Sequence, residues 1–132
     1  MSIATSVKKI LIADDEPDIL EIIQYNLQKE GYEVITAKNG SQAIDMSIKN
    51  RPDLIILDIM MPGKNGIEVC NLLRLKPVFN ETLIVFLTAL SDESTEVKGL
   101  ETGADDYITK PISPKVLVSK VNALFRRVIK DD

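Results

Sequence analysis

Acidic, basic and hydroxyl side chains stand directly after four short runs of apolar residues in this 132-residue sequence. These polar residues are Asp14-Asp15, Asp58, Thr88 and Lys110. Short apolar runs that alternate with helical patterns are typical of strands in a parallel sheet. In doubly wound sheets, ligands bind beyond the carboxyl ends of the strands, so we expect these side chains to share one cleft.

Three carboxylates in one cleft repel each other and need a positive charge to offset them. Two carboxylates about 5 Å apart repel by roughly 3 kcal/mol at an effective dielectric constant of about 20. Lys110 supplies one positive charge, but a hard divalent cation would offset more of the repulsion among the carboxylates. Carboxylates and a backbone carbonyl are the ligands that Mg²⁺ uses alongside phosphate. Zinc is excluded by ligand supply, because the chain has no histidine and a single cysteine.

Asp58 is the expected nucleophile of this cleft, because it follows the central apolar run and stands between the other groups. A carboxylate beside a divalent cation and Lys110 can attack phosphorus, since both cations stabilise charge on the phosphoryl oxygens. Ala89 is small and leaves room for a phosphodonor. The Thr88 hydroxyl can then donate a hydrogen bond to a phosphoryl oxygen. The pattern therefore predicts phosphoryl transfer to Asp58.

Five runs of residues predict the strands that position this cleft. They are residues 9–13, 33–37, 54–57, 83–87 and 106–109. The first, third and fourth runs are apolar, which indicates central strands buried on both faces. We predict an α/β fold with a doubly wound, five-stranded parallel sheet.

Helical spacing of apolar residues fills the intervals between these runs. Pro17 and Gly31 mark the expected ends of a first helix. A second helix follows Asn39-Gly40 and ends before Pro52, and a third begins near Gly66.

The last two helices are expected to differ in stability. The segment after Ser91 has few apolar anchors and a glycine, Gly99, in its middle, so it predicts the weakest helix. Ser113-Pro114 predicts an N-cap and first residue of the final helix. An apolar stripe anchors that helix, formed by Leu117, Val121, Leu124, Phe125 and Val128.

Composition narrows the possible partners and location. A net charge of −4 argues against direct binding to nucleic acid, which requires clustered lysine and arginine. There is no apolar run of about 18 residues and no secretory signal pattern. We therefore expect a cytoplasmic protein with no membrane contact. The single cysteine, Cys70, lies on the apolar side of the third helix and is expected to be a core residue.

The sequence closely resembles the receiver domain of two-component response regulators. The matching motifs are Ile-Leu-Ile-Ala-Asp14-Asp15-Glu, Leu-Ile-Ile-Leu-Asp58-Ile-Met-Met-Pro62-Gly63, Leu-Thr88-Ala89 and Lys110-Pro111. The resemblance implies a flavodoxin-like sheet in the order 2-1-3-4-5. It also implies that a sensor histidine kinase or phosphotransfer protein phosphorylates Asp58. By the same match, Mg²⁺ is held by Asp14, Asp15, Asp58 and the Met60 backbone carbonyl.

The resemblance further implies a conformational switch. Thr88 matches the switch hydroxyl, and Tyr107 matches the aromatic residue that turns inward when Thr88 moves to the phosphoryl group. Lys110 matches the lysine that pairs with the phosphate, through a typically cis bond to Pro111. Phosphorylation would then favour a pre-existing active arrangement of the fourth helix and fifth strand. For Tyr107 the alternative is an exposed aromatic residue on an edge strand.

One stretch resembles receivers of winged-helix regulators (the OmpR/PhoB type), which control transcription and dimerise through the fourth helix, fifth strand and fifth helix. The candidate dimer face comprises Lys98, Glu101, Asp105, Asp106, Lys120 and Arg126. A solvated charged surface is the alternative. Val116 departs from the subfamily pattern, which usually has a glutamate there to pair across the dimer.

From these patterns we expect residues 1–7 to be disordered, residues 8–128 to form the receiver domain, and residues 129–132 to be a tail or the start of a linker. The chain is expected to catalyse only its own phosphorylation and dephosphorylation.

Two other functions share parts of the pattern. A haloacid-dehalogenase-type phosphatase also uses an aspartyl nucleophile with Mg²⁺, but it needs a second aspartate where this chain has Met60. A flavodoxin-type electron carrier needs a hydroxyl-rich phosphate loop and aromatic residues for the flavin ring. This chain has Asp14-Asp15-Glu16 at that loop and no tryptophan.

Overall fold

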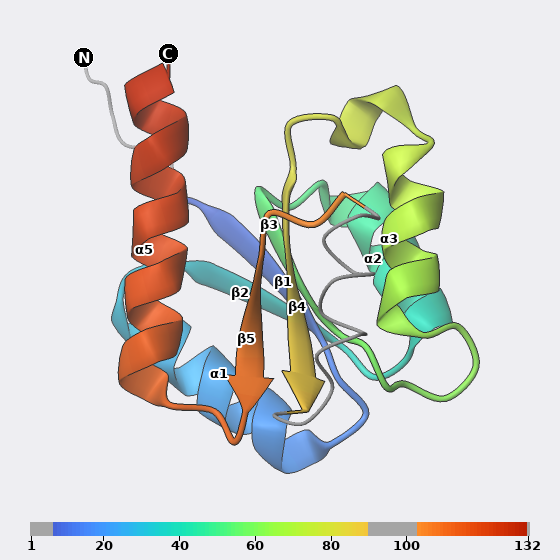
Figure 1. Ribbon diagram of the computed structural model, residues 1–132, viewed down its shortest axis with the longest axis horizontal. Helices are drawn as coiled ribbons and strands as arrows, with labels where there is room; N and C mark the ends of the chain where they lie inside the picture. The colour runs from blue at the N-terminus through green and yellow to red at the C-terminus, as the bar shows by residue number, and fades with distance from the viewer. Residues whose placement is uncertain (1–6, 90–102, 132) are drawn as a thin grey trace.

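Five parallel strands form one sheet at the centre of the structure (Figure 1). The structure is a computed structural model that describes residues 7–89 and 103–131, with side chains described as far as residue 127. The strands are β1 (Lys9–Ala13), β2 (Glu33–Ala37), β3 (Leu54–Asp58), β4 (Leu83–Ala89) and β5 (Asp106–Lys110). Their order is β2-β1-β3-β4-β5, the predicted flavodoxin-like order, with the three expected central strands in the interior.

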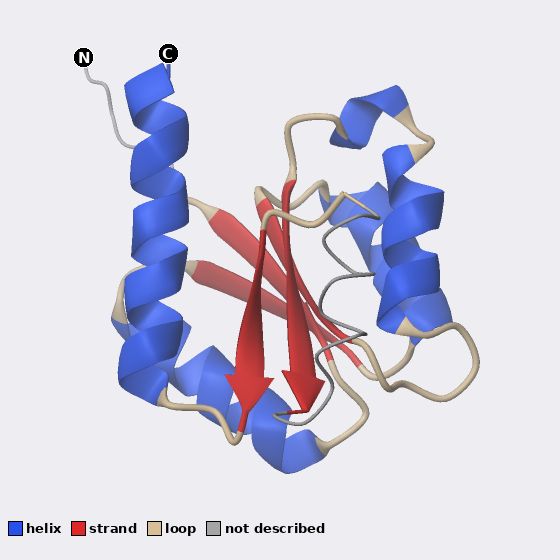
Figure 2. Ribbon diagram, in the orientation of Figure 1, coloured by secondary structure: helices blue, strands red, loops and turns tan. Residues whose placement is uncertain are grey.

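Helices cover both faces of the sheet, as Figure 2 shows. They are α1 (Pro17–Lys29), α2 (Gly40–Asn50), α3 (Gly66–Arg74) and α5 (Pro114–Asp131), with a short 3₁₀ turn, η1 (Pro77–Phe79). The starts predicted for these four helices are confirmed, whereas η1 was not predicted. The predicted fourth helix falls in residues 90–102, which lie outside the described part of the chain.

Alternate residues of each central strand enter two separate apolar cores. On β3, Leu54 and Ile56 join the core beneath α1 and α5. Ile55 and Leu57 join the core beneath α2 and α3. Burying such a side chain contributes about 1.5–3 kcal/mol, so the strands are fixed along their whole length. The polar residues that follow them are therefore held at the rim of a rigid sheet.

The sheet extends further toward the cleft than the apolar runs alone predicted. The strand ladder includes Asp58, opposite Leu87, and continues through Thr88 and Ala89 to the end of β4. Lys110 is the last residue of β5, opposite Ala89. The backbones of the predicted site residues on β3, β4 and β5 are thus held by strand pairing rather than by loops.

The loop after Asp58 is held close to the end of β3 by a glycine. A Cβ at Gly66 would lie 2.5 Å from the carbonyl oxygen of Asp58, which is closer than side chains approach. The Gly66 N–H donates to the Ile59 carbonyl at 3.1 Å. Asn65 and Glu68 then form a capping box that begins α3. This turn fixes the backbone directly beside the expected nucleophile.

Candidate functional site

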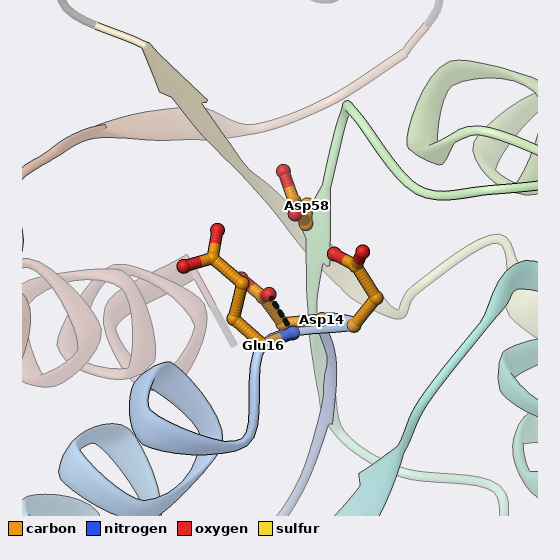
Figure 3. Close-up of side chains that lie close together, drawn as sticks. Asp14, Glu16 and Asp58 are labelled. Atoms are coloured by element: carbon orange, nitrogen blue, oxygen red, sulfur yellow. Dashed lines mark hydrogen bonds between the residues drawn. The ribbon is translucent and has the colours of Figure 1, made fainter.

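Four carboxylates converge at the carboxyl end of the sheet. One oxygen from each of Asp14, Asp15, Glu16 and Asp58 lies within 4.8 Å of the others. Asp14 and Asp58 are buried, whereas Asp15 and Glu16 are exposed. Figure 3 shows the side chains of Asp14, Glu16 and Asp58 gathered around one space. The predicted acidic cleft is therefore present, with Glu16 as an additional member.

Lys110 brings a single ammonium group into this cluster from the end of β5. Its Nζ lies 3.1 Å from Asp14 Oδ2, 3.2 Å from Asp58 Oδ2 and 3.4 Å from Glu16 Oε1. Burial alone would lower the pKa of Lys110, but hydrogen bonding and the charges of Asp14 and Asp58 outweigh it and raise that pKa. Lys110 thus remains an ammonium, shared among three carboxylates.

Asp14 has an unfavourable environment for a carboxylate. Its Oδ1 accepts a hydrogen bond of 2.8 Å from the Glu16 backbone N–H. Its buried Oδ2 accepts none: the Lys110 ammonium lies within ion-pair distance but is poorly aligned for a hydrogen bond. Burial, followed by the charge of Asp58, raises the pKa of Asp14 despite the opposing effects of Glu16 and Lys110. The Lys110 ammonium therefore does not fully offset the cost of the buried negative charge on Asp14.

Both oxygens of Asp58 have a donor. The Met60 backbone N–H donates to Oδ1 at 3.1 Å, and the Lys110 ammonium donates to Oδ2 at 3.2 Å. The side chain of Met60 itself is exposed. Asp58 is accordingly oriented by the loop after β3 and by the end of β5.

These residues fit a divalent cation that prefers oxygen ligands. Among the described residues, four carboxylates face one ammonium, and one buried carboxylate oxygen has no hydrogen-bond donor. Carboxylate oxygens are the protein ligands that Mg²⁺ takes most readily. Burial is the main cause of the raised pKa of Asp14, and a second positive group would offset the negative charge of Asp58 that adds to it.

Thr88 lies on β4, the strand next to that of Asp58, and Tyr107 lies on β5, one strand further out. Thr88 is buried near the end of β4, and its hydroxyl donates a long hydrogen bond of 3.4 Å to the Ala89 carbonyl. Tyr107 on β5 is half-buried against the core beneath α2 and α3. The ammonium of Lys120 lies 5.1 Å from the centre of its ring. The bond between Lys110 and Pro111 is cis, as the resemblance implied.

Three of the candidate dimer residues that the structure describes make contacts within the chain: Asp105, Asp106 and Lys120. Asp105 pairs with Arg74 at 3.2 Å and accepts a hydrogen bond of 2.8 Å from the Ile84 backbone N–H. Asp106 pairs with Lys120 at 3.4 Å. Arg126 is exposed on α5. Lys98 and Glu101 lie outside the described residues.

Two residues that contact these charged groups, Glu16 and Arg74, were not predicted from the sequence. Glu16 could have been found, because it is the third consecutive acidic residue after β1. Arg74 had no sequence signal: its guanidinium reaches backbone carbonyls that only the folded chain brings together. Cys70 is buried as predicted, and burial raises the pKa of its thiol to about 11.

Within the described parts of the chain, none of the helices has the length and apolar character needed to cross a membrane.

Comparison with known proteins gives a consistent match. Residues 10–122 match the family described as the response regulator receiver domain. The chain is 48% identical over 120 residues to the alkaline phosphatase synthesis transcriptional regulatory protein PhoP of Bacillus subtilis, a match that covers 91% of this chain. It covers only 49% of PhoP, so the chain spans about half the length of that curated relative.

Solved structures of similar proteins have the same fold. A putative response regulator from Chloroflexus aurantiacus is 36% identical with a TM-score of 0.86, over 89% of this chain and 97% of that one. The BeF₃-activated N-terminal receiver domain of Klebsiella pneumoniae RstA is 34% identical with a TM-score of 0.81, over 88% of this chain and 97% of that one.

Proposed function

Because this chain belongs to the receiver domain family of response regulators, we propose that it is a switch activated by phosphorylation of Asp58. The observation that supports Asp58 as the acceptor is its pair of donors. The Met60 N–H and the Lys110 ammonium each contact one of its oxygens at the rim of the sheet. The proposed domain spans residues 8–128.

In the proposed reaction, a carboxylate oxygen of Asp58 forms a bond to the phosphorus of the donor. The bond between phosphorus and the donor's leaving atom breaks, so the product is an acyl phosphate. Lys110 is placed to pair with the negative oxygens of the incoming group. Asp14, Asp15, Asp58 and the Met60 carbonyl are the proposed ligands of Mg²⁺, which when bound supplies charge neutralisation to the phosphoryl oxygens.

The switch would start at Thr88. Among the described residues its hydroxyl donates a long hydrogen bond, to the Ala89 carbonyl, so it can turn to donate to a phosphoryl oxygen on Asp58 at small cost. Tyr107 lies on the neighbouring strand, where Thr88 pairs with Thr109. A change at Thr88 would shift the preferred position of the Tyr107 ring, and with it the surface of β5 and α5.

The partners follow from the family and remain proposals. The phosphodonor would be a sensor histidine kinase or a phosphotransfer protein, in the cytoplasm. The switched surface would act on an output domain, on another protein, or on a second copy through β5, α5 and the segment 90–102. Apart from its own phosphorylation and dephosphorylation, the chain would catalyse no reaction. The match to a transcriptional regulatory protein supports control of transcription.

Incubation with acetyl phosphate and Mg²⁺ tests this function. Intact-protein mass spectrometry should show the addition of one phosphoryl group to the wild type. Asp58→Asn should show none, because an amide is not a nucleophile for this reaction. Asp45→Asn is a matched control, since it makes the same change on the exposed face of α2 and should be phosphorylated like the wild type.

The same experiment separates the switch from a phosphatase. A receiver should accumulate up to one equivalent of phosphate, whereas repeated turnover of a phosphate ester with no accumulated phosphoprotein would favour the phosphatase. Phosphorylation of Asp58→Asn to the same extent as the wild type would refute Asp58 as the acceptor.

A further inference from the structure

Glu16 has two separate contacts with the Asp58 site. Its backbone N–H donates to Asp14 Oδ1 at 2.8 Å, which leaves the other oxygen of Asp14 facing Lys110. Its side-chain Oε1 lies 3.4 Å from the Lys110 ammonium. One residue therefore orients a buried carboxylate and also contacts the ammonium that this carboxylate shares with Asp58.

The position of Glu16 explains how its side chain comes to face the site. It is the N-cap residue of α1, where short polar side chains usually accept a hydrogen bond from the first turn. Glu16 makes no such capping bond. Figure 3 shows its carboxylate among the carboxylates of Asp14 and Asp58 instead. The side chain is thus directed to the site and contributes nothing to the helix cap.

The three carboxylates around Lys110 differ sharply in burial. The side chains of Asp14 and Asp58 are 0% and 4% exposed, whereas that of Glu16 is 60% exposed. Lys110 accordingly lies between two buried carboxylates and one on the solvent side. Any anionic group that approaches Asp58 from solvent meets the charge of Glu16 and competes with it for the same ammonium.

We infer that Glu16 is a specificity-determining residue of this site: its carboxylate holds Lys110 on the solvent side and opposes small anionic phosphodonors until the donor displaces it from the ammonium. The inference rests on the proposed phosphorylation of Asp58. Glu16 would act through Lys110 and through its charge, without itself contacting the reacting atoms.

The rate of phosphorylation by acetyl phosphate at saturating Mg²⁺ tests the inference. Glu16→Gln should react about three- to tenfold faster than the wild type at low salt, because one negative charge no longer repels the dianionic donor. Glu16→Asp keeps the charge and should stay near the wild-type rate. Asp18→Asn is the matched control, since Asp18 is an exposed acidic residue in the first turn of α1 and lies outside the carboxylate cluster.

Salt separates the charge effect from a change in local structure. The advantage of Glu16→Gln should shrink toward the wild-type rate at about 1 M salt, where charges are screened beyond about 3 Å. A structural effect would persist at high salt and would also appear in Glu16→Asp.

The outcomes are distinguishable from failure of the proposed function. If the wild type and Asp18→Asn are phosphorylated but Glu16→Gln is equally fast or slower, the role of Glu16 is wrong and Asp58 still stands as the acceptor. An equal increase in the phosphorylation rate of Asp18→Asn would also overturn the role of Glu16, because the rate would then depend on the net charge of the protein. If no variant is phosphorylated, both proposals fail.

Discussion

Two clusters of charged side chains lie at opposite ends of β4 and β5, and they are built differently. At the carboxyl ends, Lys110 is shared among three carboxylates, and one buried oxygen of Asp14 has no hydrogen-bond donor. At the amino ends, the guanidinium of Arg74 pairs with one carboxylate of the described residues, that of Asp105. We refer to these as the Lys110 cluster and the Arg74 cluster.

The charged groups of the Arg74 cluster have almost all of their hydrogen bonds. The guanidinium donates to the carbonyls of Phe79 and Thr82 at 2.8 Å each, and to that of Gly103 at 2.9 and 3.1 Å. Asp105 also accepts from the Ile84 backbone N–H. The cluster joins the end of α3 and the turn after it to the strands β4 and β5, and leaves no unpaired charge.

The contrast shows how a stable edge strand can carry an unstable site. β5 has β4 as its only strand neighbour among the described strands. Its amino end is fixed by the Arg74 cluster, so its carboxyl end can hold Lys110 among excess negative charge. Buried charges that are incompletely paired destabilise a fold. The excess negative charge at this site favours binding of a cation, and such sites are often functional. Stability and function are therefore divided between the two ends of one strand.

Removal of the guanidinium should give the largest loss of stability. Arg74→Met keeps the apolar stem but removes every donor, so three carbonyls and Asp105 lose a partner. We expect the free energy of unfolding to fall by about 2–3 kcal/mol in urea titrations. Arg127→Met, an exposed arginine on α5, should cost far less. Equal losses from the two variants would show that the Arg74 cluster is not a structural anchor.

Neutralisation of Asp14 should increase the free energy of unfolding, in contrast to the loss expected from Arg74→Met. Without Mg²⁺ at pH 7, we expect Asp14→Asn to raise the free energy of unfolding by about 1–2 kcal/mol, because it removes an incompletely paired buried charge. The pKa of Asp14 is raised in the folded chain, so the folded state binds its proton more tightly. Wild-type stability is therefore lost relative to the variant as the pH rises through the unfolded and then the folded pKa of Asp14.

The pH series and Mg²⁺ provide the checks on Asp14. At a pH below the ordinary pKa of 3.8, Asp14 is neutral in both states and the advantage of the variant should shrink. Mg²⁺ should stabilise the wild type more than Asp14→Asn, since a ligand stabilises the state that binds it. A variant less stable than the wild type at neutral pH would contradict the account of an unfavourable site.

Removal of the ion pair between Lys120 and Asp106 should give the smallest change in the free energy of unfolding. Both side chains are about one-third exposed, at 34% and 31%. Lys120→Met should cost about 1 kcal/mol, including the contact of the ammonium with the Tyr107 ring and its hydrogen bond of 2.9 Å to the Tyr107 carbonyl. A loss as large as that of Arg74→Met would mean that exposure does not distinguish the charge pairs of β5.

The sequence was sufficient to predict the strands and the close approach of Asp14, Asp15, Asp58 and Lys110. Continuous apolar runs mark β1, β3 and β4, because these strands are buried on both faces. Parallel strands bring their carboxyl ends together, which is why the sequence predicts that Asp14, Asp58 and Lys110 share one cleft. Strand ends were less predictable, since pairing extends β4 beyond its apolar run to Thr88 and Ala89.

Contacts made by long side chains across the fold could not be predicted in the same way. Arg74 reaches Gly103, 29 residues away, and Asp105, 31 residues away. The sequence offered Asp105 as a candidate for a dimer face, but an exposed charge and an internally paired one look alike in sequence. The contacts of Glu16 likewise depend on an N-cap whose side chain turns away from its helix.

The most direct test of the central claim is the location of the phosphoryl group on the chain. After treatment with acetyl phosphate and Mg²⁺, reduction with borohydride converts an aspartyl phosphate to homoserine, which peptide mass spectrometry can locate. We predict homoserine at position 58 and at no other aspartate. Homoserine at position 14 or 15 instead, or its absence from a phosphorylated chain, would contradict the assignment of Asp58 as the acceptor.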